Sequence, residues 1–336
     1  MIKYADVVVD LQAGDTGKGK VAYSLLKKPD EFTHVIRYNG GGNAGHTIYH
    51  NGQKVVTHFI PCGVLYGIKS IIGLGCVVNV EKLFKEIQEL ENLGFDVKSN
   101  LMIDKRVHII TDKHLEEDGK DSKIGTTKQG IGPAYRDKYG RVGSRAGQEP
   151  LLQPFICDIY DLHDKNVEVK ALFEGAQGFE LDIDWGDYPY VTSSHCTIGS
   201  AILNGFPPQT IREVYGVAKA YRTYVGAKTF EEPSEVFEKI RKLGQEFGAT
   251  TGRKRQIRWF DVEDVIKAIN INGVTRLVIN KLDILEQVGE FKLYDFGGIF
   301  FPFNKSEEFV DAIKKRIIDN CPTIKTITFS STPYDI

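Results

Sequence analysis

The chain has 336 residues, a formal net charge of −2 and 41% hydrophobic residues. The near-neutral charge gives no support for a nucleic-acid or membrane partner, and no apolar run approaches the length of a membrane span. Five scattered cysteines without a CxxC pair argue against a disulfide framework or a zinc site, and with a strand predicted so near the start we expect no signal peptide and a cytoplasmic protein.

Short apolar stretches alternate with amphipathic ones along the chain. The pattern predicts strands at residues 6–11, 33–38, 70–78, 107–110, 169–173, 213–218, 274–279, 292–296 and 325–329. It predicts helices at residues 20–28, 80–93, 234–247, 262–270 and 306–320, the last with Ser306 as its N-cap. This alternation indicates a large α/β fold with a mainly parallel central sheet covered by helices, and functional loops at the carboxyl ends of its strands. We find no repeat and no linker, so we expect one domain over residues 1–336.

A glycine-rich loop, Gly-Asp-Thr-Gly-Lys-Gly-Lys at residues 14–20, lies between the first predicted strand and helix. Such a loop points backbone N–H groups and a helix N-terminus at phosphate. It nearly fits the G-x-x-x-x-G-K-[ST] pattern of P-loops, but Val21 stands where the magnesium-binding hydroxyl belongs. Asp15 is the obvious substitute ligand. The alternative is an ordinary strand–helix turn, which explains the two lysines and the acid less well.

The sequence Asn280-Lys281-Leu282-Asp283 follows the apolar strand predicted at residues 274–279. A carboxylate at the end of a strand can accept two hydrogen bonds from the N1–H and 2-amino edge of guanine. Adenine lacks this pair of donors and would leave the carboxylate unpaired. The motif therefore predicts guanine recognition, although four residues of this kind also occur by chance.

Residues 39–47, Asn-Gly-Gly-Gly-Asn-Ala-Gly-His-Thr, follow the second predicted strand. The glycines let the backbone approach a ligand closely. His46, beside a phosphate site, could donate a proton or stabilise growing negative charge. The alternative is a loop histidine in solvent.

Two later loops combine hydroxyl groups with cations. Residues 124–133 carry threonines and amides and are followed by Arg141 and Arg145, so they could hold another phosphate or form a flexible surface loop. Residues 248–255, Gly-Ala-Thr-Thr-Gly-Arg-Lys-Arg, present planar guanidinium groups that match carboxylate or phosphate. This second loop suggests closure on an anion, although Lys254 alone is more simply a solvated surface charge.

Taken in order, these segments resemble the adenylosuccinate synthetase family from about residue 6 to residue 333. The motifs that carry the resemblance are residues 14–20, 41–47, 125–135, 173–178, 181–194, 247–255, 281–283 and 330–333. The chain is shorter than the usual bacterial or eukaryotic form, between residues 147 and 173 and between 283 and 330, and is similar to a compact form found mostly in archaea. The resemblance implies a P-loop-NTPase-like fold with a modified Gly-Asp-Thr-Gly-Lys-Gly-Lys loop.

The resemblance implies a GTP-dependent ligase of AMP biosynthesis. IMP, L-aspartate and GTP would give adenylosuccinate, GDP and phosphate through a 6-phosphoryl-IMP intermediate. Asp15 would be the catalytic base that takes the N1 proton of IMP, and His46 the catalytic acid. Mg²⁺ would be held by Asp15 and the carbonyl of Gly45. A homodimer is also implied, in which Arg141 reaches the IMP phosphate of the neighbouring subunit.

The same resemblance implies three overlapping sets of binding residues. The GTP-binding set is Gly14, Asp15, Thr16, Gly17, Lys18, Gly19, Lys20, Gly45, His46, Thr47, Arg255, Lys281, Leu282, Asp283, Ser330, Ser331 and Thr332. The IMP-binding set is Asp15, Thr16, Gly17, Lys18, Asn43, Ala44, Gly45, His46, Thr127, Arg141, Gln177, Thr192 and Arg253. The aspartate-binding set is Ala249, Thr250, Thr251, Gly252, Arg253, Lys254 and Arg255.

The chain departs from the family pattern at four places. Thr16 replaces a usual Glu, Gly42 a common His and Gln129 a common Arg, and residues 330–333 lack the usual glycine, which makes the guanine contacts there less secure. Two other hypotheses remain open. A GTP-binding switch would explain the two nucleotide motifs but not His46 or residues 248–255. A paralogue that binds nucleotide without catalysis is disfavoured by the intact Asp15 and His46.

Overall fold

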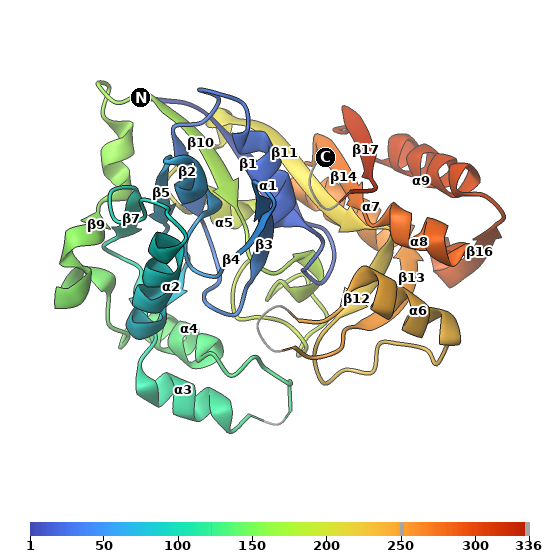
Figure 1. The fold of residues 1–336 in the computed structure, drawn as a ribbon, viewed down its shortest axis with the longest axis horizontal. Coiled ribbons are helices and arrows are strands. Elements are labelled where there is room, and N and C mark those ends of the chain that lie inside the picture. Colours follow the sequence, from blue (N-terminus) through green and yellow to red (C-terminus); the bar gives the residue numbers. More distant parts are fainter. Residues whose placement is uncertain (122, 249–251, 333–336) are drawn as a thin grey trace.

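The computed structural model describes residues 1–121, 123–248 and 252–332. In this part of the chain a nine-stranded sheet forms the centre of the molecule, and neighbouring strands pair in parallel throughout (Figure 1). The order across the sheet is β17 (Thr326–Ser330), β14 (Arg276–Asn280), β11 (Ile211–Lys219), β1 (Ile2–Asp10), β10 (Val169–Glu174), β2 (His34–Arg37), β5 (Lys69–Ile72), β7 (Leu101–Asp104) and β9 (Ile156–Cys157). The predicted parallel α/β sheet is confirmed.

Helices cover both faces of this sheet. The helices of the described residues are α1 (Lys18–Leu26), α2 (Val80–Asn92), α3 (Asp112–Gly119), α4 (Ile131–Tyr139), α5 (Ile198–Ile202), α6 (Glu235–Gly244), α7 (Val262–Asn272), α8 (Leu282–Val288) and α9 (Ser306–Asn320). Of these, α3 and α4 pack on each other and on the short pair of β6 (Val77–Val78) and β8 (His108–Ile109) instead. In β1 the side chains of Val7 and Val9 pack in the core that holds α7 and α9, whereas Val8 packs in the core that holds α1 and α2. Because β1 is buried on both faces, its sequence is a continuous apolar run, as expected for a central parallel strand.

Smaller sheets stand beside the main one. A four-stranded sheet contains β12 (Tyr221–Tyr224), β13 (Gln256–Asp261), β15 (Phe291–Asp295) and β16 (Ile299–Phe303). The other two are the hairpin of β3 (His46–His50) and β4 (Gln53–Thr57) and the pair of β6 (Val77–Val78) and β8 (His108–Ile109). In Figure 1, α3 and α4 lie on one side of the lower centre of the molecule, and β12, β13 and α6 lie on the other. No helix in the described ranges is long and apolar enough to cross a bilayer.

Two local predictions are wrong. The strand predicted at residues 70–78 is two short strands, β5 and β6, because the chain bends at Gly73 and Gly75 to pass close to the end of β2. A Cβ at Gly75 would lie 1.9 Å from the carbonyl oxygen of Tyr38, a contact that only glycine permits. Ser306 is the first residue of α9, and the N-cap is Lys305.

Candidate active site

The glycine loop between β1 and α1 adopts a backbone that its sequence requires. Gly14 and Gly17 have φ angles of 88° and 102°, and Asp15 has a φ of 56°. A Cβ at Gly19 would lie 2.8 Å from the Cβ of His46, and one at Gly17 would lie 2.7 Å from the Nδ2 of Asn280. The glycines therefore provide positive φ and also let the loop lie against two other segments of the predicted site.

Gly17→Ala should therefore cost more stability than an equivalent change elsewhere. Gly52, in the β3–β4 turn, also has a positive φ (82°), but its Cβ would meet nothing within 4 Å. We expect Gly52→Ala to cost about 1 kcal/mol from backbone strain alone, and Gly17→Ala to cost clearly more because Asn280 must also move. Denaturant unfolding of both variants measures this difference, and equal losses would show that the Asn280 contact imposes no constraint.

A buried carboxylate, that of Asp10 at the end of β1, binds the glycine loop on its buried side. It accepts hydrogen bonds from the backbone N–H of Gln12 at 2.9 Å and from Lys18 Nζ at 2.9 Å, and it also binds the Thr16 hydroxyl. Lys18 Nζ donates in addition to the carbonyl oxygen of Gln177 at 2.5 Å. The side chains of Thr16 and Lys18 are thus buried, whereas Asp15 is the exposed residue of the loop.

His46, the first residue of β3, lies within a buried polar group. Its Nδ1 is 3.3 Å from Arg37 Nη1 and 3.6 Å from Glu174 Oε1. Burial and the Arg37 charge lower the pKa of His46. Burial would raise the pKa of Glu174, but its contacts with His46 and Arg37 outweigh this and lower it to about 2.

Arg37 favours one tautomer of the neutral His46 ring. Because Arg37 can only donate, its contact at 3.3 Å favours the form in which Nδ1 accepts and Nε2 carries the proton over the form in which Nδ1 donates to Glu174 at 3.6 Å. Nε2 is buried and has no hydrogen-bond partner among the described residues. His46 therefore presents an unsatisfied donor on the side of the ring away from Arg37.

The guanine motif and the end of the chain meet beside the glycine loop. Asn280 Nδ2 donates to the carbonyl oxygen of Thr16 at 2.7 Å. Asn280 pairs in register with Ser330 on the neighbouring strand β17, and Lys20 Nζ lies 2.7 Å from the Ser330 hydroxyl. Lys20 also donates to the carbonyl oxygen of Thr332 at 2.9 Å. Lys281 has a φ of 69° and donates to the carbonyl oxygen of Gly244, and Leu282 and Asp283 open α8 directly after it.

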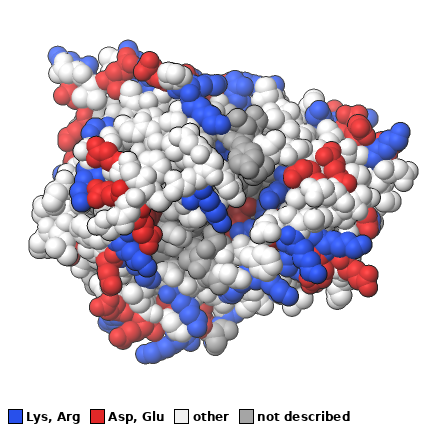
Figure 2. Space-filling model, viewed as in Figure 1, with Lys and Arg blue, Asp and Glu red and all other residues white. Residues whose placement is uncertain are grey.

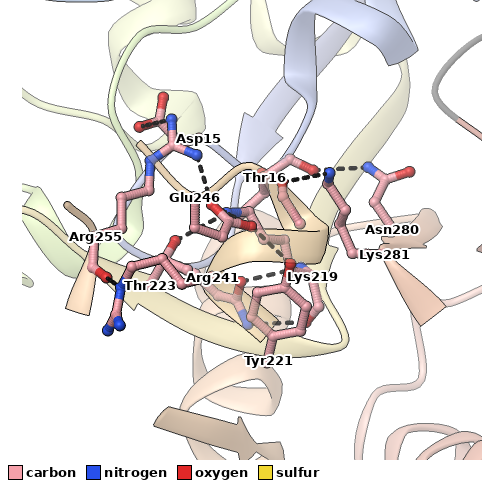
Figure 3. Close-up of polar contacts among 12 residues, drawn as sticks. Asp15, Thr16, Lys219, Tyr221, Thr223, Arg241, Glu246, Arg255, Asn280 and Lys281 are labelled. Carbon is pink, nitrogen blue, oxygen red and sulfur yellow. Dashed lines mark hydrogen bonds and ion pairs between the residues drawn. The ribbon is translucent and has the colours of Figure 1, made fainter. Parts of the chain in front are cut away.

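Arg255, from the segment between α6 and β13, pairs with Asp15 of the glycine loop. Its Nη2 lies 2.8 Å from Asp15 Oδ2, and its Nη1 lies 2.5 Å from Glu246 Oε2 (Figure 3). Arg253 Nη1 donates to the carbonyl oxygen of Gly125 at 3.0 Å, which joins this loop to the one before α4. Lys254 is exposed, as expected for a solvated charge. Ala249, Thr250 and Thr251 lie outside the described residues.

The remaining predicted residues lie in loops around this centre. Asn43 accepts from the Gly41 N–H, Ala44 accepts from His58, and Thr192 donates its N–H to Leu181. Thr127 is partly exposed, and the Gln177 side-chain oxygen is buried without a hydrogen-bond partner among the described residues. Arg141 is exposed just past the end of α4. Figure 2 shows Lys and Arg side chains on both sides of the hollowed centre of this face.

Comparison with known proteins identifies the family. The model of the family described as adenylosuccinate synthetase matches residues 7–152 and 148–303. The adenylosuccinate synthetase of Chlorobium limicola is 39% identical over 346 residues, which cover 86% of this chain and 79% of the relative. The chain belongs to the adenylosuccinate synthetase family.

Other members agree with this assignment. The adenylosuccinate synthetase of Thermodesulfovibrio yellowstonii is 37% identical over 94% of this chain and 85% of its own. The structure of the fully ligated adenylosuccinate synthetase from Plasmodium falciparum superposes with a TM-score of 0.85 at 28% identity and covers 98% of both chains. The family and fold expected from the motifs are confirmed, and with them a GTP-dependent ligase of purine nucleotide biosynthesis.

The structure gives physical reasons for two departures from the usual pattern of adenylosuccinate synthetases. A Cβ at Gly42 would lie 2.5 Å from Cζ of Phe59, so the Phe59 ring fills the space that a side chain at position 42 needs. The Thr16 side chain is buried against the Asp10 carboxylate, where a second acid would be repelled. Gln129 accepts a hydrogen bond from Lys82 Nζ at 2.6 Å.

Several residues of the site were missed from the sequence. They are Asp10, Arg37, Glu174, Lys219 and Glu246, all of them charged and buried. Four of the five share a signal that could have found them. Asp10, Arg37, Glu174 and Lys219 each close an apolar strand at its carboxyl end, the edge of a parallel sheet where ligands bind.

Proposed function

We propose that this chain joins IMP to L-aspartate with GTP, giving adenylosuccinate, GDP and phosphate. The observation that supports this best is the meeting of three distant segments at the glycine loop. His46 packs on Gly19, Asn280 binds Thr16, and Arg255 pairs with Asp15. A simple nucleotide switch has no need for the last contact or for a buried histidine.

Asp15 is the proposed base. The 6-oxygen of IMP is a poor leaving group, so it must be phosphorylated before an amine can displace it. Removal of the N1 proton makes that oxygen anionic enough to attack the γ-phosphate of GTP. Asp15 is suited to this step because its side chain is 38% exposed, whereas the other carboxylate on Arg255, that of Glu246, is fully buried.

His46 is the proposed acid. Phosphoryl transfer depends mainly on positioning and on stabilising the charge of the oxygens in transit. A buried Nε2–H that has no hydrogen-bond partner among the described residues is a donor that a phosphoryl oxygen can satisfy. The backbone N–H groups of residues 14–20 and the N-terminus of α1 would hold the phosphates of the nucleotide.

Mg²⁺ fits the donors that the site offers. The Asp15 carboxylate and the Gly45 carbonyl are hard oxygen ligands of the kind that Mg²⁺ prefers, and they would supply the ligand missing at Val21. When bound there, Mg²⁺ would neutralise charge on the phosphate oxygens. Arg255 pairs with the same carboxylate, so it would have to share or release Asp15.

The family resemblance suggests the other substrate contacts. Arg253, Arg255 and the rest of residues 249–255 would hold the aspartate carboxylates while the amine displaces the 6-phosphoryl group. Asn43, Thr127, Gln177 and Thr192 would bind IMP; the unsatisfied side-chain oxygen of Gln177 supports its part in this set.

We further propose that the whole chain is one domain that works as a homodimer in the cytoplasm. Arg141 would reach the IMP phosphate of the neighbouring subunit. Tyr139 and Val142 beside it are 64% and 75% exposed, which suits a surface that another subunit covers. The five cysteines, all in the described ranges, are free, as a reducing compartment requires.

One assay tests the function. Protein, Mg²⁺, GTP, IMP and aspartate are mixed, and the ultraviolet change of the purine is followed together with GDP release. We expect GDP release to depend on both IMP and aspartate. GTP hydrolysis that is indifferent to both would favour the switch, and tight IMP binding without product would favour the inactive paralogue.

Asp283→Asn should change the base that the enzyme accepts. The amide oxygen can still accept from N1–H, but its NH₂ faces the 2-amino group of guanine, so we expect the KM for GTP to rise about 10- to 100-fold. Xanthosine triphosphate, whose 2-oxygen accepts from the amide, should become the better donor. Steady-state kinetics with both nucleotides measure this, and an unchanged preference would mean that guanine is recognised elsewhere.

A further inference from the structure

Glu246 binds the Arg255 guanidinium and accepts hydrogen bonds from three side chains in all. The carboxylate is fully buried and accepts from Lys219 Nζ at 2.8 and 2.9 Å, from the Tyr221 hydroxyl at 2.7 Å and from Arg255 Nη1 at 2.5 Å (Figure 3). Lys219 is equally buried and also binds the Thr223 hydroxyl at 3.0 Å. Of the five side chains in this cluster, only that of Arg255 was predicted for the site; the others are Lys219, Tyr221, Thr223 and Glu246.

The charges alternate along a chain that ends at the proposed base. Lys219 is followed by Glu246, then by Arg255, then by Asp15, and each link is an ion pair. Burial would raise the pKa of Glu246, but Lys219 and Arg255 outweigh it and lower that pKa to about 2, so the carboxylate is charged. Of these four side chains, Asp15 is the one most open to solvent.

The other end of this series of ion pairs, Lys219, is bonded to the loop that carries Asp15. The backbone N–H of Lys219 donates to Gln12 Oε1 at 3.0 Å, and Gln12 Nε2 donates back to the Lys219 carbonyl at 3.2 Å. Gln12 stands in the same loop as Asp15. Lys219 and Asp15 are therefore both tied to the same loop. This holds the Arg255 guanidinium in a fixed position relative to Asp15.

We infer that Glu246, held by Lys219, is a positioning residue that keeps the Arg255 guanidinium against Asp15 and toward the substrates. A long arginine side chain has many rotamers, and a second carboxylate behind it removes most of them before substrate arrives. This inference rests on the proposed function, in which Arg255 contacts aspartate and GTP.

The competing explanation is that the cluster only stabilises the fold around α6. The backbone of Arg255 has its own anchors, because its N–H donates to the Glu246 carbonyl at 3.1 Å and its carbonyl accepts from Arg241 Nε at 2.9 Å. Removing the charge of Glu246 should therefore release the Arg255 side chain and leave the backbone in place. The two explanations predict different kinetics.

Glu246→Gln is the test, with Asp6→Asn as its matched control. Asp6 is also a fully buried carboxylate on a guanidinium, that of Arg212 at 2.7 and 2.9 Å, but it lies in the middle of β1, away from the glycine loop. We expect both variants to lose thermal stability. For Glu246→Gln alone we expect kcat to fall about 10- to 100-fold and the KM for aspartate to rise about tenfold, with the dissociation constant of IMP within about threefold. Unchanged kcat and KM in folded Glu246→Gln would overturn the inference.

A crystal structure of Glu246→Gln separates this inference from the proposed function. The position of Arg255 tests the positioning role even if the parent protein makes no adenylosuccinate. We expect the guanidinium to move away from Asp15 in the variant. An Arg255 Nη2–Asp15 Oδ2 distance that stays near 2.8 Å would refute the positioning role. If Glu246→Gln does not fold, Glu246→Asp is the second variant to test. Its shorter side chain keeps the negative charge but places it farther from Arg255. We expect this variant to recover only part of kcat, and full activity would contradict the proposal.

Discussion

Asp15→Asn is expected to lower kcat by about 10³-fold or more while IMP binds within about tenfold of its parent affinity. An amide cannot take the N1 proton of IMP, so the 6-oxygen would stay neutral and would not attack the γ-phosphate. The backbone should tolerate the change, because asparagine adopts the positive φ of 56° at this position as readily as aspartate does. Single-turnover formation of GDP measures the chemical step, and titration calorimetry with IMP measures binding.

Asp30→Asn is the matched control. Asp30 also has a φ of 56°, and it lies in the exposed turn between α1 and β2. We expect this variant to keep the parent kcat, which would show that the loss at Asp15 comes from chemistry and not from backbone strain. Turnover of Asp15→Asn equal to that of the parent would remove this carboxylate from the mechanism.

The elements that the sequence predicts well are those with strong local signals. The apolar run of β1, the glycines after it and the motif after β14 each specify their own structure within a few residues. The strand at residues 70–78 was predicted wrongly because its bend is imposed from outside, by the Tyr38 carbonyl that passes within reach of Gly75. The order of the nine strands likewise depends on pairings between distant segments, such as β1 with β10 and β11, which no local pattern encodes.

The residues of the site also divide into those with a local sequence signal and those placed by distant contacts. Asp15 and His46 stand in loops whose composition already suggests phosphate chemistry. Glu174 and Glu246 are single acids in apolar or helical surroundings, and their partners His46 and Lys219 are 128 and 27 residues away in the sequence. Their burial depends on the assembled sheet, so the motifs identify the residues proposed to touch substrate more readily than the buried charges that hold them. A charge that closes an apolar strand, as Glu174 does, is the one local signal for the second kind.

His46→Gln is expected to lower kcat about 10²- to 10⁴-fold, the usual contribution of a general acid. The amide can donate a hydrogen bond but cannot give up its proton, so it should stabilise the phosphoryl group in transit only in part. Because burial and Arg37 lower the pKa of His46, the ring should be neutral near neutral pH, with its proton on Nε2. Pre-steady-state measurement of 6-phosphoryl-IMP formation isolates this step.

His50→Gln provides the control for His46→Gln on the same strand. His50, at the far end of β3, bonds the Tyr23 hydroxyl at 2.8 Å within an aromatic cluster, so its loss should reduce stability without reducing kcat. Glu174→Gln adds a second check, because removing that charge leaves Arg37 uncompensated beside His46 and should slow the same step. If His46→Gln formed the phosphorylated intermediate at the parent rate, the buried ring would be a support for Gly19 and the proton would have to come from another donor.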